Sequence, residues 1–184
     1  DLKLPVGARL AVFNGRLHPA KGLSDLIRAW PLVRREVPNA RLWLVGTGEA
    51  RSNLVETVEN LGLFKHVIFP GVFDSLEEVL LAADLFVLPS YQGGLSVALL
   101  EAMASQTPLV ASDIPVHREV AEDAALFAPP GNVRALADAI GCLWCDQELR
   151  AQLVARGLQR KQCFSWDASA KKARALYERV AGKA

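Results

Sequence analysis

Short apolar segments alternate with helical segments along most of this 184-residue chain. Each apolar segment is three to five residues long and ends near glycine, proline or a small polar residue, which is typical of buried strands. Six such strands are predicted, at residues 9–13, 41–45, 66–69, 84–88, 108–112 and 125–127. Buried strands separated by helices predict a parallel sheet covered on both faces, the Rossmann-like, doubly wound α/β fold.

The intervening segments repeat apolar residues at helical spacing. The first predicted helix runs from residue 23 to the Pro38-Asn39 pair, and the second follows the Gly46-Thr-Gly48 turn and ends at about residue 61. Further helices are predicted over 75–83, 96–105, a short stretch after Pro115, 132–145, 148–162 and 166–181. Ser75 and Glu78 have the spacing of a capping box, and Asn132 is expected to cap its helix. We expect one domain over residues 1–184, with a linker-like start at 1–7 and C-terminal helices over 147–184.

The composition excludes several classes of protein. An apolar fraction of 51%, a charged fraction of 22% and a net charge of +1 are ordinary for a globular domain and give no electrostatic case for nucleic-acid binding. No apolar run approaches the ~20 residues of a membrane span, and the N-terminus has no signal-peptide pattern. The cytoplasm is therefore the expected location.

No metal site or disulfide framework is predicted. The three cysteines are too few for a framework, and Cys142-x-x-Cys145 lacks the second pair that a zinc site needs. Because both lie in an apolar helical segment, we expect them to act as small buried side chains. The three histidines, at positions 18, 66 and 117, have no metal-ligand spacing and are expected to be structural or exposed.

A strand, a Gly-Gly turn and a helix at residues 85–104 offer the clearest binding site. Gly93 and Gly94 allow close approach of the backbone to a ligand, and Ser96 is expected to cap the helix whose first amides form an anion site. Ligands of such sheets bind beyond the carboxyl ends of the strands, where Arg16, Lys21 and Glu101 are also expected. Two cations, free amides and one carboxylate suit the pyrophosphate and ribose of a nucleotide.

Each of these features also has an ordinary explanation. Taken alone, Arg16 and Lys21 could be solvated loop charges, and Glu101 a surface acid of its helix. The Gly46-Thr-Gly48 turn lacks one glycine of the dinucleotide-binding fingerprint. Asp113 either lines the site or caps the next helix.

The order of the motifs is more specific than any one of them. In sequence they are GRLHPAKG (15–22), LVGTG (44–48), VIFPG (67–71), ADLFVLPS (83–90), LEAMA (100–104), TPLVAS (107–112) and FSWD (164–167). Together they resemble the C-terminal, donor-binding domain of the family-4 retaining glycosyltransferases, also described as glycosyl transferases group 1. The resemblance covers essentially the whole chain.

This resemblance implies one half of a GT-B fold, in which two Rossmann-like domains face each other across a cleft. The implied reaction transfers a sugar from a UDP- or GDP-sugar to an acceptor with retention of configuration, in polysaccharide or glycoconjugate biosynthesis. No metal or other cofactor is implied, and the acceptor stays unidentified. The N-terminal acceptor domain is absent from this sequence and would supply any peripheral membrane contact. The isolated chain is therefore expected to bind nucleotide without turnover.

The resemblance also implies roles for individual residues. Arg16 and Lys21 would bind the diphosphate and stabilise the departing nucleotide, while Glu101 would bind the ribose. The remaining implied contacts are with the base, from Phe69, Gly71 and Val72, and with sugar hydroxyls and phosphate, from Gly93, Gly94, Leu95, Ser96 and Val97.

Gly93 departs from the family pattern. The family pairs two glutamates eight positions apart, and counting back from Glu101 places Gly93 where the first is expected. Two alternatives to a working glycosyltransferase therefore stay open. One is a degenerate, non-catalytic nucleotide-sugar-binding module, and the other is an epimerase or phosphorylase with the GT-B fold.

Overall fold

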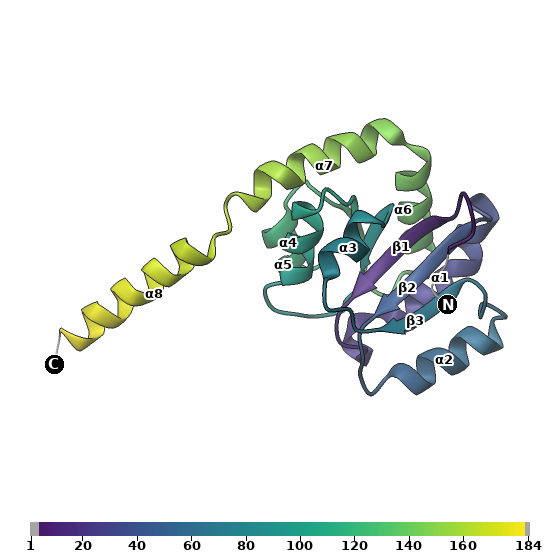
Figure 1. Ribbon diagram of the computed structural model, residues 1–184, viewed down its shortest axis with the longest axis horizontal. Coiled ribbons are helices and arrows are strands. Elements are labelled where there is room, and N and C mark those ends of the chain that lie inside the picture. The colour runs from purple at the N-terminus through teal and green to yellow at the C-terminus, as the bar shows by residue number, and fades with distance from the viewer. Residues whose placement is uncertain (1–3, 183–184) are drawn as a thin grey trace.

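A six-stranded parallel sheet forms the centre of the protein (Figure 1). The computed structural model describes residues 4–182. The strands are β1 (Arg9–Asn14), β2 (Ala40–Val45), β3 (Val67–Gly71), β4 (Leu85–Leu88), β5 (Leu109–Ser112) and β6 (Leu126–Ala128). Their order across the sheet is β3-β2-β1-β4-β5-β6, and every neighbouring pair is parallel. The Rossmann-like α/β fold expected from the sequence is therefore confirmed.

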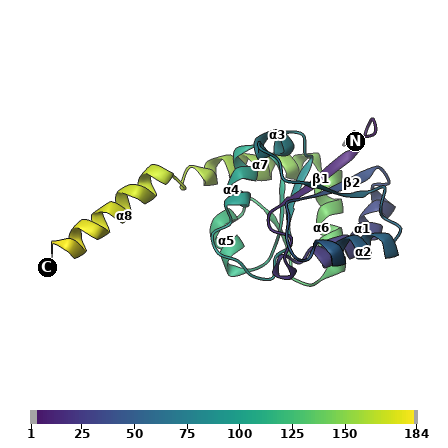
Figure 2. The same cartoon turned by 60° about the horizontal axis from the view of Figure 1, so that its bottom comes forward.

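Helices connect the strands and cover both faces of the sheet (Figures 1 and 2). They are η1 (Pro19–Lys21), α1 (Leu23–Glu36), α2 (Arg51–Asn60), α3 (Leu76–Leu81), α4 (Val97–Ala104), α5 (Pro115–Ala121), α6 (Val133–Cys145), α7 (Gln147–Lys161) and α8 (Trp166–Ala181). Helix α1 packs against α2 and α6, whereas α4 packs against α5 and α7. These two groups lie on opposite faces because the strand order reverses at the centre of the sheet and crossover connections keep one hand.

The reversal lies between β1 and β4. From β1 the chain moves outward to β2 and β3, then returns to β4 and continues to β5 and β6. The loops that follow β1 and β4 therefore leave the sheet in opposite directions, and in folds of this kind ligands bind at the carboxyl edge where such loops diverge. These loops carry Arg16, Lys21 and the Gly93-Gly94 turn.

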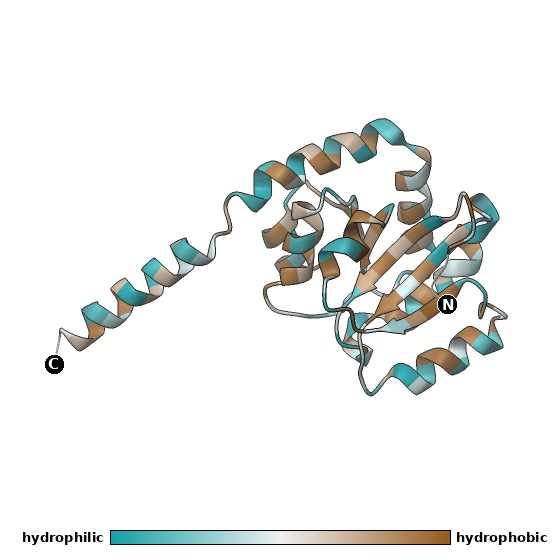
Figure 3. Ribbon diagram, in the orientation of Figure 1, coloured by the Kyte–Doolittle hydropathy of each residue, from teal (hydrophilic) through white to brown (hydrophobic). Residues whose placement is uncertain are grey.

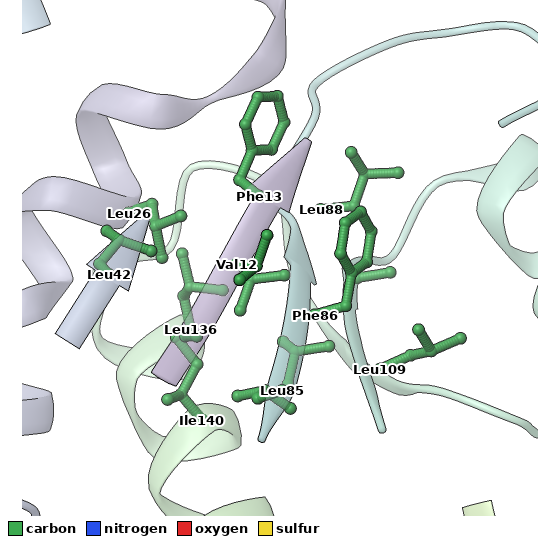
Figure 4. Packing of buried hydrophobic residues seen from close by; sticks show 14 of the residues in the cluster. Val12, Phe13, Leu26, Leu42, Leu85, Phe86, Leu88, Leu109, Leu136 and Ile140 are labelled. Atoms are coloured by element: carbon green, nitrogen blue, oxygen red, sulfur yellow. The ribbon is translucent and has the colours of Figure 1, made fainter. Parts of the chain in front are cut away.

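The core is continuous across the sheet and the helices that cover it. Phe13 and Phe86 on the two central strands have no exposed surface. Figure 4 shows Leu26 of α1, and Leu136 and Ile140 of α6, packed beside these strands. Burial of each such side chain is worth about 1.5–3 kcal/mol, and the apolar strand pattern in the sequence is explained by this two-sided cover.

Helix α8 differs from the other helices because it extends away from the body of the protein (Figures 1 and 2). None of its residues is buried, and Trp166 and Tyr177 are 79% and 73% exposed. Brown and teal bands alternate along it in Figure 3, as expected for an amphipathic helix. Its apolar side chains are therefore free of contact with the core.

Two local predictions were wrong and one is confirmed. Ser75 stands at the N-cap of α3, but its side chain makes no capping hydrogen bond with a described residue, so no capping box forms. Cys142 and Cys145 lie on α6 but are exposed, because the helical period places them opposite the face that packs on α1. Asn132 does cap α6, since its side chain accepts a hydrogen bond from the amide of Ala135 at 3.0 Å.

Glycines let the loops at the carboxyl edge approach each other closely. Gly46 has φ of 128°, and a Cβ there would lie 2.0 Å from the carbonyl oxygen of Gly15. Gly22 has φ of 65°, and a Cβ there would lie 2.1 Å from the carbonyl oxygen of Pro89. The loop after β1 thus packs backbone to backbone against the loops after both neighbouring strands, which fixes the position of Arg16 and Lys21.

We expect Gly46→Ala to lower the free energy of unfolding by more than about 2 kcal/mol, because the methyl group forces two backbones apart and strains φ. Chemical denaturation monitored by circular dichroism measures this. Gly93→Ala is the matched control, since its Cβ meets open space and its φ is not positive. Equal denaturation midpoints for the two variants would contradict the close-packing account.

Candidate functional site

The amides at the start of α4 form an anion-binding surface. Among the described residues, no hydrogen-bond acceptor is found for the backbone N–H groups of residues 92–98. The first bonded amide of this region is that of Leu99, which donates to the carbonyl of Ser96 at 3.1 Å. Unpaired amides at a helix N-terminus attract anions through their direction and the helix dipole. This surface contains Gly93, Gly94, Leu95, Ser96 and Val97.

Ser96 occupies the N-cap of α4, where the sequence places it, but its hydroxyl makes no capping hydrogen bond. The expected side-chain cap is therefore wrong. Its physical consequence is that the first amides of α4 stay available to a ligand instead of being satisfied by the serine.

Neither glycine of the Gly93-Gly94 turn is required by the fold. Both have φ outside the left-handed region, and a Cβ at either position would meet no atom within 4 Å. These glycines thus differ from Gly22 and Gly46, whose neighbours leave no room for a side chain. A glutamate at position 93 would be accommodated without strain.

Arg16 lies on the loop after β1 and is paired with Glu49. Its Nε and Nη2 atoms lie 3.2 Å and 3.1 Å from Oε2 of Glu49. The two side chains are 70% and 48% exposed, so the pair is a weak surface ion pair that a stronger ligand can separate. Hydrogen bonding from its own backbone amide, together with the charge of Arg16, lowers the pKa of the Glu49 carboxyl.

His18 connects this pair to the turn that carries Lys21. Its Nδ1 accepts a hydrogen bond from the amide of Ala20 at 3.0 Å, which caps η1. Since Nδ1 is an acceptor, Nε2 carries the proton and donates to Oε1 of Glu49 at 3.2 Å. His18 is thus a structural residue, one of the two outcomes expected for it.

An open hollow of about 600 Å³ lies over the ends of β1 and β2. Arg16, Glu49 and Val72 line it together with the glycine turns of both loops. Val72 is 72% exposed. Gly71 beside it has φ of 88°, and its carbonyl oxygen accepts a hydrogen bond from the amide of Gly46 at 2.7 Å. Phe69 is half-buried, with the guanidinium of Arg51 5.7 Å from its ring centre.

Glu101 lines a second hollow of about 530 Å³, between α4 and the start of α8. Leu95, Val97 and Trp166 are among its other lining residues. Partial removal from water raises the pKa of the Glu101 carboxyl. The structure therefore places Arg16 with Val72 in one hollow, and Leu95, Val97 and Glu101 in the other.

The other polar residues considered from the sequence have local partners. Asp113 does not cap α5, whose N-cap is Ile114, but binds Arg118 through two hydrogen bonds of 2.7 Å and 2.8 Å. His66 lies 2.9 Å from the guanidinium of Arg41. His117 is buried, and burial lowers its pKa.

Sequence reasoning missed Glu49, although it directly follows the Gly46-Thr-Gly48 turn. The only sequence signal for it is its place after that turn, because its contact with Arg16 spans 33 residues of the chain. Within residues 4–182, no three His, Cys, Asp or Glu side chains come together as metal ligands, and no helix has the length and apolarity to cross a membrane.

A model of the family described as "Glycosyl transferases group 1" matches residues 1–160. The chain belongs to this family. It is 32% identical to a phosphatidyl-myo-inositol mannosyltransferase of Mycobacterium leprae, with 94% of this chain and 47% of the relative aligned. It is 33% identical to a D-inositol 3-phosphate glycosyltransferase of Corynebacterium efficiens, with 96% and 44% aligned.

Solved glycosyltransferase structures have the same fold. A sucrose-phosphate synthase from Thermosynechococcus elongatus superposes with a TM-score of 0.88 at 28% identity, over 98% of this chain and 47% of that one. Anabaena HepE in complex with UDP superposes with a TM-score of 0.84 at 23% identity, over 93% and 49%. The chain thus spans about half the length of the curated relatives it matches, as expected for one domain of a GT-B protein.

We expect Glu49→Gln to strengthen binding of inorganic pyrophosphate by about two- to fivefold, because it removes the carboxylate that competes for Arg16. Isothermal titration at low salt measures the dissociation constant. Asp138→Asn is the matched control, since Asp138 forms a similar exposed pair with Arg134 on α6 at 2.9 Å. If Glu49→Gln bound pyrophosphate more weakly than Asp138→Asn does, the proposed competition between the Glu49 carboxylate and pyrophosphate for Arg16 would be contradicted.

Proposed function

We propose that this chain is the donor-binding domain of a retaining glycosyltransferase, and that it holds a nucleoside diphosphate sugar of the UDP or GDP type. The observation that carries the proposal is the pair of loops at the strand reversal. The loop after β1 carries Arg16 and Lys21, and the loop after β4 leads to the free amides of α4. The amide of Tyr91 ties these two loops together at the carbonyl of Ala20, and positive side chains on one loop with free amides on the other suit a diphosphate that contacts both.

Family membership supports the same reaction class, and a structural relative with this fold was solved in complex with UDP. In the proposed reaction the bond between the anomeric carbon and the diphosphate oxygen breaks, and the diphosphate leaves with the electron pair. Arg16 and Lys21 neutralise the charge that develops on it, which is the role of fixed cations at a leaving group. The acceptor oxygen then bonds to the anomeric carbon on the face that the diphosphate left, and the proton of the acceptor hydroxyl passes to an oxygen of the departing diphosphate.

The remaining site residues have proposed roles around the diphosphate. Glu101 accepts hydrogen bonds from the ribose hydroxyls, and its partial removal from water strengthens such bonds. Phe69, Gly71 and Val72 lie at the end of β3, where an exposed valine offers apolar contact to a base.

Turnover is proposed to require a second domain. The hollow over β1 and β2 is open to solvent on this chain, and water would compete with an acceptor for the sugar. The length of the curated relatives and the exposed apolar side chains of α8 support a two-domain protein.

A degenerate binding module is the second candidate function, and Gly93 favours it. The fold does not require glycine at this position, so neither packing nor backbone conformation explains why the family's acid is absent. A module of this kind would keep nucleotide binding and lose transfer.

We expect the wild-type chain to bind UDP or GDP in isothermal titration, and Arg16→Ala or Lys21→Ala to weaken that binding at least about tenfold through loss of a charge-assisted contact. ADP is titrated in parallel to compare bases. Arg134→Ala, on the exposed face of α6, is the control and should bind as the wild type does. No binding of any of the three nucleotides would exclude the proposed function.

We expect Gly93→Glu to give no gain in transfer when this domain is joined to an acceptor domain, because the proposal treats Gly93 as part of a working site. Radiolabelled sugar transfer measures the rate, and Gly93→Gln controls for size without charge. A gain of about tenfold or more, equivalent to one transition-state contact of ~1.4 kcal/mol, would favour the degenerate module instead.

A further inference from the structure

The loop of residues 90–95 runs from the end of β4 to the start of α4, and among the described residues its backbone is hydrogen-bonded to another loop only at its beginning. The amide of Tyr91 donates to the carbonyl of Ala20 at 2.9 Å, which ties this loop to the turn that carries Lys21. Residues 92–95 form no backbone hydrogen bond with any other described residue. The position of the free amides near Gly93 therefore depends on the contacts of Ser90 and Tyr91.

One of these contacts joins the side chain of Tyr91 to Asp25. The phenol of Tyr91 donates a hydrogen bond to Oδ2 of Asp25, and this bond raises the pKa of Tyr91. Asp25 lies in the first turn of α1, immediately beyond Lys21 and Gly22, and is only 8% exposed. Within residues 4–182, Asp25 forms one ion pair, with Arg28, whose Nη1 lies 4.0 Å from Oδ1. A buried carboxylate needs strong hydrogen bonds, so this contact is worth more than an exposed one.

Ser90 is held by the end of β5, the strand that pairs with β4 on the side away from β1. The hydroxyl of Ser112, at the end of β5, donates to the carbonyl of Ser90. Nδ1 of His117 lies 3.1 Å from that hydroxyl and 3.0 Å from the carbonyl of Ser112, so it carries a proton that both oxygens accept. The start of the loop therefore stays in place when the phenol of Tyr91 is removed, and only the part after Tyr91 is released.

We propose that Tyr91 and Asp25 are positioning residues. They hold the loop amides of residues 93–95 at a fixed separation from Lys21, while packing of α4 holds the amides at its start, so that one ligand with two phosphates is contacted by both loops at once. The pair itself does not touch the reacting atoms. This inference rests on the proposed function, because it assigns the pair a purpose in binding a diphosphate.

A fixed separation matters for a ligand that bridges the two loops and not for one that contacts a single loop. Ordering a mobile loop costs conformational entropy on binding, and preorganisation removes that cost. Inorganic pyrophosphate spans two phosphate positions, whereas inorganic phosphate fills only one. The two anions therefore separate a positioning role from a general loss of charge or stability.

The test titrates pyrophosphate and phosphate into the wild-type chain and into Tyr91→Phe. Nuclear magnetic resonance spectra recorded during each titration give the dissociation constants. We expect Tyr91→Phe to weaken pyrophosphate binding about tenfold and to change phosphate binding less than about twofold. Tyr91 is 43% exposed and the substitution removes one hydroxyl, so the fold is retained. Tyr177→Phe on α8 is the matched control, because Tyr177 makes no side-chain hydrogen bond with a described residue.

Asp25 provides two further variants. Asp25→Leu removes the acceptor while keeping the same branching of heavy atoms and should reproduce the effect of Tyr91→Phe. Asp25→Asn keeps an oxygen that accepts the hydrogen bond from the phenol and should bind pyrophosphate within about threefold of the wild-type affinity. Equal losses in Asp25→Asn and Asp25→Leu would overturn the hydrogen bond as the source of the effect.

A second measurement tests the positioning role without any ligand. The amide order parameters of Gly93 and Gly94 should fall in Tyr91→Phe from the rigid range near 0.85 to below about 0.6. Unchanged order parameters would overturn the positioning role even if the wild-type chain binds UDP. A fall in these values in a chain whose wild type binds no UDP, GDP or pyrophosphate would instead leave the loop contact standing and contradict the proposed function.

Discussion

Close backbone contact at the carboxyl edge of the sheet is the constraint on which the site depends. The loop after β1 touches the loop after β2 at Gly46 and the segment after β4 at Gly22, where even a methyl group would collide with a carbonyl oxygen. These contacts bring segments that are far apart in the sequence into one rigid edge. The cations of the loop after β1 and the free amides that follow β4 can then bind the same ligand, because these two segments are packed together.

The charge of Arg16 at this edge is paired before any ligand is present. Arg16 is paired with Glu49, and His18 links Glu49 to the turn of Lys21. A loop with these partners stays ordered without an anion, and the exposed ion pair separates at little cost when a diphosphate supplies stronger contacts. At the end of the loop after β4, the first amides of α4 lack a serine cap, so no side chain within residues 4–182 competes with a ligand for them.

Most of the fold could be predicted from the sequence, whereas the contacts within the site could not. The six strands followed from local apolar runs, and the cap at Asn132 from its own position before a helix. The exposure of Cys142 and Cys145 was also open to prediction, because the helical period places them opposite Ile140 and Leu143. By contrast, Arg16 and Glu49 are 33 residues apart, and Asp25 and Tyr91 are 66 apart. No local sequence pattern predicts such pairs, since they depend on which loops become neighbours at the edge of the sheet.

The most direct test of the central claim is a crystal structure of this chain with UDP or GDP. The account predicts that diphosphate oxygens lie within about 3 Å of amides in residues 94–97 and of the Lys21 amine. It also predicts that the guanidinium of Arg16 turns from Glu49 to the diphosphate. A diphosphate bound away from α4, or bound there while Arg16 stays on Glu49 and Lys21 makes no contact, would contradict the account.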